Sequence, residues 1–225
     1  MKGLFLSIIF LLSGIYLVEA QNCTFYFPTK TGTVLVTKSY NDKDKLTSTA
    51  KSTILELKGD KIKFSTEAYD GKDKLLSKGE YEVGCENGEF AVDMNSFMQG
   101  VNKDAYKDME VKMTTKSMSI PANLQTGQKL NDGEITMNVS NQGMTMMNMV
   151  TKITNRKVDA IEEITTSAGK FNCAKIIYDV ETKMMMLIHT KGVQWISQKV
   201  GVVRSESYDQ KGKLMGYSVL ASITQ

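Results

Sequence analysis

Methionine is the residue type in this chain whose density most suggests chemistry. The sequence holds 15 methionines in 225 residues, concentrated in two short runs, Met144–Met149 and Met184–Met186. Thioether sulfur is a soft ligand that suits Cu(I), so a copper site is one hypothesis. On a strand, however, Met144 and Met146 would face one side, while the other two methionines of that run face the opposite side. Methionine also fills irregular apolar space and forms adaptable binding surfaces. We favour this second interpretation, with no metal and no other cofactor.

Signals for an enzyme are weaker. The acidic residues Asp42, Asp44, Asp70 and Asp73 lie in turn-like segments that lack the spacing, glycine and terminal glutamate of a calcium loop. The chain has a single histidine, His189, which disfavours most catalytic triads and zinc sites. It contains no nucleophile elbow and no phosphate loop. We therefore predict that the protein is not an enzyme, and we assign no catalytic residue.

The N-terminus indicates export. Lys2 precedes an apolar run, and small residues stand at the −3 and −1 positions of a cleavage site after Ala20, so residues 1–20 resemble a secretory signal peptide. Gln21 and Asn22 before Cys23 argue against lipid attachment, since a lipoprotein signal needs a small residue there. We expect residues 21–225 to form a single β-rich domain with no transmembrane segment, located in the periplasm or outside the cell.

Cysteine and charge content restrict the partners. An exported chain with three cysteines, Cys23, Cys85 and Cys173, is expected to form one disulfide and keep one thiol. Three pairings are possible; we favour Cys23–Cys85, which would pin the mature N-terminus, and expect the third cysteine to be an inert buried thiol. The net charge of +3 comes from scattered lysines, without the concentrated basic stripe that nucleic-acid binding requires. Nucleic acid is therefore not an expected partner.

Alternation of apolar and polar residues predicts antiparallel strands. Ile62 and Phe64 alternate with lysines, and the same period of two recurs in residues 134–140 and 217–223. A repeated pattern of Tyr, Asx and Lys-Leu at residues 39–46, 68–75 and 207–214 is typical of β-hairpin turns. A change of face near Thr115 suggests a bulge.

A short helix is the one exception. Phe97, Met98, Val101 and Ala105 recur at helical spacing after a possible cap at Asn95. The predicted fold is mainly β: an antiparallel meander of roughly 10–13 strands that curls into a barrel or half-barrel, with this helix over one edge or mouth.

Several segments resemble one family. Trp195 to Leu214 is one of them, and Cys23–Pro28, Ile153–Val158 and Thr166–Cys173 are the others. Together they are similar to the TapB-like family of exported bacterial proteins, grouped with a domain of unknown function. The resemblance covers essentially the whole mature chain and implies an exported β-rich domain of a Gram-negative envelope. It implies no catalytic residues.

Two function hypotheses follow. The first is a non-enzymatic envelope protein that binds an apolar small molecule or lipid in a concavity of the curved sheet. Its expected lining residues are Met137, Met144, Met146, Ile153 and Trp195. The alternative is a structural or protein-interaction module that contacts another envelope protein, which predicts a solid core and an exposed apolar patch. Copper binding is a distant third hypothesis.

Overall fold

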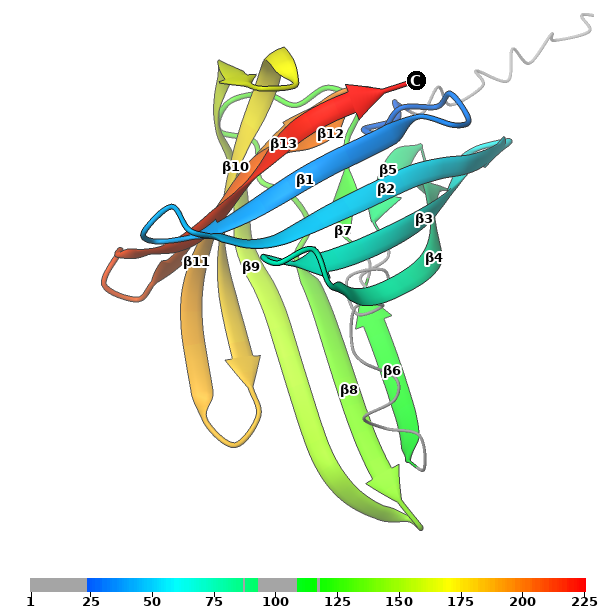
Figure 1. Cartoon of the computed structure of the whole chain (residues 1–225). Helices are drawn as coiled ribbons and strands as arrows, with labels where there is room; N and C mark the ends of the chain where they lie inside the picture. The colour runs from blue at the N-terminus through cyan, green and yellow to red at the C-terminus, as the bar shows by residue number, and fades with distance from the viewer. Residues whose placement is uncertain (1–23, 87, 93–108, 117) are drawn as a thin grey trace, which may run out of the picture.

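The chain folds as one antiparallel β-sheet. The computed structural model describes residues 24–86, 88–92, 109–116 and 118–225, and these contain thirteen strands (Figure 1). The strands are β1 (Val34–Asn41), β2 (Leu46–Lys58), β3 (Lys61–Asp70), β4 (Leu75–Glu86), β5 (Glu89–Val92), β6 (Glu110–Lys116), β7 (Met118–Ile120), β8 (Gly133–Asn141), β9 (Met144–Thr166), β10 (Gly169–Lys183), β11 (Leu187–Ser197), β12 (Gly201–Asp209) and β13 (Leu214–Thr224). The predicted mainly-β antiparallel architecture is confirmed.

The short helix of the predicted fold is not seen among the described residues. The described residues contain no helix, and therefore none that could span a membrane. The expected short helix, from Phe97 to Ala105, lies outside the described residues.

The three copies of the tyrosine repeat form the same hairpin turn. In each copy the side-chain oxygen of an Asx residue, Asn41, Asp70 or Asp209, accepts the backbone N–H groups of the residues two and four positions later. These hydrogen bonds are between 2.8 and 3.0 Å long. The residue three positions after each Asx adopts a left-handed φ, between 57° and 79°, which Asp and Gly tolerate. The ladder also shifts register at the tyrosine before each turn. The repeat therefore builds the hairpins β1–β2, β3–β4 and β12–β13, as predicted.

The sheet curls without closing. Its strand order is β6-β8-β9-β10-β11-β12-β13-β1-β2-β3-β4-β5-β7, so the two end strands, β6 and β7, are neighbours in sequence. β6 pairs with β8 and β7 pairs with β5, and no ladder joins β6 to β7 within the described residues. The change of face near Thr115 therefore marks the place where the chain leaves one end of the sheet for the other. The described sheet is therefore open and curved, and the predicted closed barrel is not confirmed.

The body of the molecule has an apolar core that includes several aromatic rings. Phe25, Tyr26 and Phe27, which precede β1, pack against Phe64 and Phe90, with ring centroids 5.0 to 6.4 Å apart. The Tyr26 hydroxyl donates a hydrogen bond to the carbonyl of Pro121 (2.8 Å), and the carbonyl of Phe25 accepts the N–H of Lys199 (2.9 Å). The buried members of this core cluster are Tyr26, Ile54, Ile62, Phe64, Val83, Phe90, Ile120, Leu130, Val158, Ala174, Ile176 and Ile196. Aromatic rings from the segment before β1 thus pack into the core of the body.

An arm projects beyond the body (Figure 1). β9 is 23 residues long; it pairs with β10 only from Val150 onward, whereas its pairing with β8 begins at Met144. We call β6, β8 and residues 144–154 of β9 the arm. Beside it the β10–β11 hairpin ends in Met184–Ile188, which we call the hairpin tip.

The cysteines differ in state. Cys173 is a free thiol and is 1% exposed, which confirms the expected buried thiol; that it is inert stays a prediction. Burial raises the pKa of Cys173 to about 11. Cys85 is not a free thiol. Cys23 lies outside the described residues, so the Cys23–Cys85 pairing stays a prediction.

Candidate binding site

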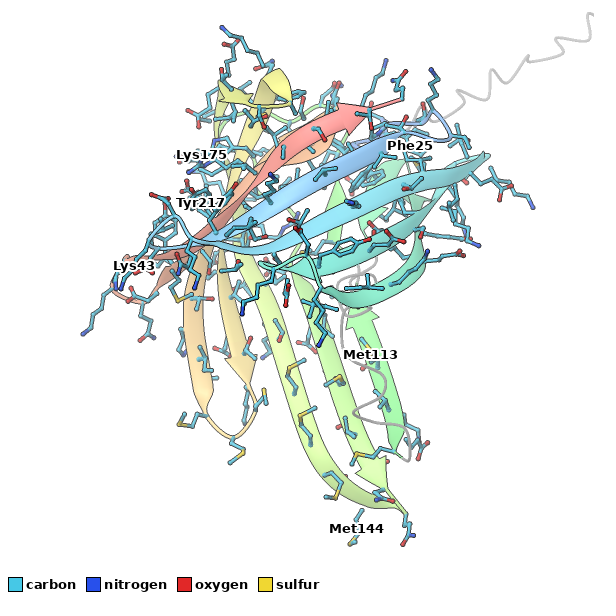
Figure 2. The ribbon with its side chains drawn as sticks, viewed as in Figure 1. Phe25, Lys43, Met113, Met144, Lys175 and Tyr217 are labelled. Carbon is cyan, nitrogen blue, oxygen red and sulfur yellow. The ribbon has the colours of Figure 1, made fainter. Side chains whose placement is uncertain are left out.

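Strand register gathers methionines on one face of the arm. In β8 the buried apolar side chains are Ile135, Met137 and Val139, at 4%, 4% and 1% exposure. Met137 stands directly opposite Met113 of β6 and Met149 of β9. Because opposite residues of an antiparallel pair point to the same side, three thioethers lie in one row across the arm. Figure 2 shows Met113 on β6 and Met144 at the far end of the arm.

Further apolar residues extend this row in both directions. Met147 is paired with Val139, one step toward the end of the arm. In the other direction, Met118 and Ile135 form a small buried cluster with Met113 and Ile153. We call this surface the methionine face; its members are Met113, Ile135, Met137, Val139, Met147, Met149 and Ile153.

A bulge in β9 brings an arginine onto the same side. Asn155 has a left-handed φ of 55°, and the pairing of β9 with β10 shifts register here. Regular alternation would place Ile153 and Arg156 on opposite faces. Because of the bulge, Arg156 is buried at 5% exposure, and Val158 after it is fully buried in the core cluster. Arg156 therefore lies between the methionine face and the core of the body.

The guanidinium of Arg156 has backbone partners only. Its Nη1 donates to the carbonyl oxygens of Ser119 (3.4 Å) and Asn131. None of the ion pairs found in the described part of the chain includes it. Burial lowers the pKa of Arg156, while Tyr178 and Asp132 act in the opposite direction. Burial likewise raises the pKa of Tyr178. The site thus combines an apolar surface with a buried cation.

The structure separates the residues predicted to bind a ligand. Met137 and Ile153 lie on the methionine face. Met144 and Met146 begin β9 at the end of the arm, where they are 68% and 60% exposed. Trp195 belongs to another cluster, with Cys173 and Val203. The five residues therefore do not line one cavity, and a role for each in binding stays a prediction.

Trp195 is a packing residue on the body. It is 7% exposed, and its indole Nε1 donates a hydrogen bond to Glu162 Oε1 (2.6 Å). Lys175 and Arg204 each lie 5.9 Å from the centre of its ring. Trp195 is therefore a buried packing residue whose ring makes cation–π contacts with two basic side chains.

The hairpin tip is apolar and exposed. Met185 is 98% exposed and Met186 75%, while Leu187 and Ile188 are each 51% exposed. Lys183 opposes Val150 in the ladder between β10 and β9, so the tip lies beside the arm. Apolar side chains at such exposure normally mark a contact surface.

Metal binding has little support among the described residues. They contain no group of three or more His, Cys, Asp and Glu residues that could hold a metal ion. His189 Nδ1 lies 3.8 Å from Glu181 Oε2, and both side chains are exposed. Methionine thioethers are not among those ligand types. Met144 and Met146 are exposed while Met147 and Met149 belong to the methionine face, so copper binding by the first methionine run stays a prediction.

Sequence reasoning missed two parts of this site. Met113 and Met149 were not assigned to it, because their alignment with Met137 depends on register between three strands. Arg156 was missed because a left-handed asparagine, which sequence alone does not reveal, turns it inward.

The chain matches one protein family. A family model described as DUF3108-like matches residues 30–220; this match does not confirm the TapB-like name. No curated protein matches the chain.

Two solved structures are similar over nearly the whole chain. One is a presumed lipoprotein from Parabacteroides distasonis, with 28% identity and a TM-score of 0.75; the match covers 91% of this chain and 100% of that one. The other is a presumed exported protein with a YmcC-like fold from Bacteroides fragilis, with 23% identity, a TM-score of 0.72 and coverage of 90% and 100%. The second likeness shows the fold alone.

Proposed function

The chain belongs to the DUF3108-like family, and we propose that it is an exported envelope protein, without enzymatic activity, that holds an apolar ligand or lipid on the methionine face. The signal-like residues 1–20 support export. The similar protein described as a presumed lipoprotein supports the same location.

The row of Met113, Met137 and Met149 carries the proposal. Unbranched thioether side chains adjust to irregular apolar shapes and suit binding surfaces better than tightly packed cores. The two flanking members, Met113 and Met149, are half-buried, so a ligand could still remove apolar surface from water. Aliphatic and aromatic side chains pack the core of the body, and we therefore place the binding surface on the arm.

Two measurements test binding. Lipid extracted from detergent-free protein and identified by mass spectrometry should be present in stoichiometric amounts. A fluorescent fatty-acid methyl ester should bind the protein, and the double variant Met113→Gln/Met149→Gln should weaken this binding about tenfold, through lost apolar contact. Met215→Gln is the matched control, because Met215 is 44% exposed on the body. Empty spectra together with no ester binding would refute the proposal.

A second candidate function is a protein-interaction module. The observation that favours it is the exposed hairpin tip, with Met185 98% exposed. Crosslinking in intact cells should then recover one recurrent protein partner, and Met185→Asp should remove it. Leu76→Asp is the control, since Leu76 is also an exposed apolar residue (57%) on a different hairpin. Loss of the partner in both variants, or in neither, would argue against the tip as the contact surface.

A further inference from the structure

A buried positive charge stands at the inner end of the methionine face. Arg156 is 5% exposed, and its Nη1 contacts the backbone of Ser119 and Asn131. Ser119 follows Met118, which packs with Ile135, Met113 and Ile153. Leu130, which precedes Asn131, belongs to the core of the body and donates its N–H to the carbonyl of Arg156 (2.9 Å). The guanidinium is thus fixed at the boundary between the apolar arm and the core.

The charge is incompletely compensated. A guanidinium carries five N–H donors, and within the described residues only Nη1 has hydrogen-bond acceptors. Both acceptors are neutral carbonyls, and no carboxylate of the described chain forms an ion pair with Arg156. Removing a charge from water costs free energy that a paired anion normally offsets. Tyr178 and Asp132 oppose the lowering of the Arg156 pKa only through electrostatic interaction. Nε and Nη2 therefore have no acceptor among the described residues, and an anion would supply one.

We infer that the ligand of the methionine face is an anionic amphiphile, whose carboxylate or phosphate group pairs with Arg156 while its apolar chain lies along the arm. This inference rests on the proposed binding function and specifies its ligand class. Arginine is suited to the role, because its planar fork binds both carboxylate and phosphate through two parallel hydrogen bonds.

The dimensions of the arm agree with this arrangement. A strand rises about 3.3 Å per residue, so the stretch from Arg156 to Met149 spans about 23 Å. One acyl chain occupies about half of the hydrocarbon core of a bilayer, or about 15 Å. A chain whose head group is at Arg156 would therefore pass Ile153 and extend toward the methionine row without leaving the methionine face.

A paired-ligand titration tests the inference on the mature protein. The probes are a fluorescent fatty acid and its methyl ester, which have the same chain but differ in charge. The acid should bind about 10- to 100-fold more tightly than the ester, the range expected for a charge-assisted hydrogen-bonded pair. Arg156→Gln should remove this preference, because acid affinity should fall toward that of the ester, and Arg156→Lys should retain part of it. Arg204→Gln is the control, since Arg204 is the only other arginine in the chain and lies on the body. It should leave the preference unchanged.

The outcomes separate the two proposals. Equal binding of acid and ester by the wild type would overturn the anionic ligand while leaving apolar binding intact. A preference that persists in Arg156→Gln would overturn the role of Arg156. Failure to bind either probe would overturn the proposed function itself. Because the acid-to-ester ratio is measured on the wild type, the inference stays testable even if Arg156→Gln does not fold. A lysophosphatidate and an unlabelled fatty acid are then compared as competitors of the fluorescent fatty acid. Stronger displacement by the lysophosphatidate would identify phosphate as the natural head group, and stronger displacement by the fatty acid would identify carboxylate.

Discussion

Gly192→Ala should destabilise the protein through a single steric contact. Gly192 is buried on β11 directly opposite Tyr178 of β10. A Cβ at this position would lie 2.2 Å from Cε2 and 2.3 Å from Cζ of the Tyr178 ring. Ordinary carbon contacts are about 3.5–4.0 Å, so the ring would have to move by more than about 1 Å. Tyr178 packs against the core cluster, which restricts that movement.

The expected loss can be derived from two opposing effects. Overpacking a well-filled site costs about 1–3 kcal/mol. Replacing glycine by alanine restricts the unfolded chain, which returns about 0.4–1 kcal/mol. The net loss should be about 1–2 kcal/mol of unfolding free energy. With a urea m-value of about 2 kcal/mol/M, the midpoint of unfolding should fall by about 0.5–1 M.

Urea unfolding followed by the fluorescence of Trp195, the only tryptophan, measures this shift. A double-mutant cycle with Tyr178→Ala provides the control. Once the ring is absent, Gly192→Ala should be neutral or stabilising. An equal loss in both backgrounds would show that the cost comes from the backbone at Gly192, and the reasoning from the Tyr178 contact would be refuted.

Two further predictions concern titratable groups. The pKa of Asp70 is lowered, first by the N–H of Lys74 and then by that of Lys72, so its stabilising effect is full above the ordinary carboxyl pKa and is lost as pH falls through the lowered value. The stability difference between the wild type and Asp70→Asn should therefore shrink below about pH 4 in urea titrations; a difference that stays constant to pH 2 would contradict this. Cys173, with its pKa raised to about 11, should react with iodoacetamide at pH 8 only as fast as the protein opens, and the rate should rise with urea. Rapid labelling of the native protein would contradict its burial.

Local structure was predictable wherever neighbouring residues determine it. The turn at Asp70 depends on one side chain and two N–H groups within four positions, and the sequence pattern contains all three. The inward faces of Ile62 and Phe64 follow from period-two alternation, and both side chains are fully buried. Each of these features is decided within one hairpin.

Contacts between distant strands were not predictable in the same way. Alternation places Met137 on one face of its strand, but it does not tell which residues of β6 and β9 stand beside it. The change of face near Thr115 was visible in the sequence, yet a bulge and a transfer between sheet ends produce the same pattern. Trp195 and Met137 were expected to line one concavity, but Trp195 packs in the cluster of Cys173 and Val203.

The distribution of side chains separates stability from binding. Aromatic rings such as Phe64 and Phe90 pack in the body, where stiff side chains favour one arrangement. Thioethers such as Met113 and Met149 lie on the arm, where several arrangements cost little free energy. A ligand can therefore rearrange the methionine face without disturbing the aromatic core. It follows that substitutions at Met113 and Met149 should change ligand affinity much more than unfolding free energy, whereas substitutions at Phe90 should do the opposite.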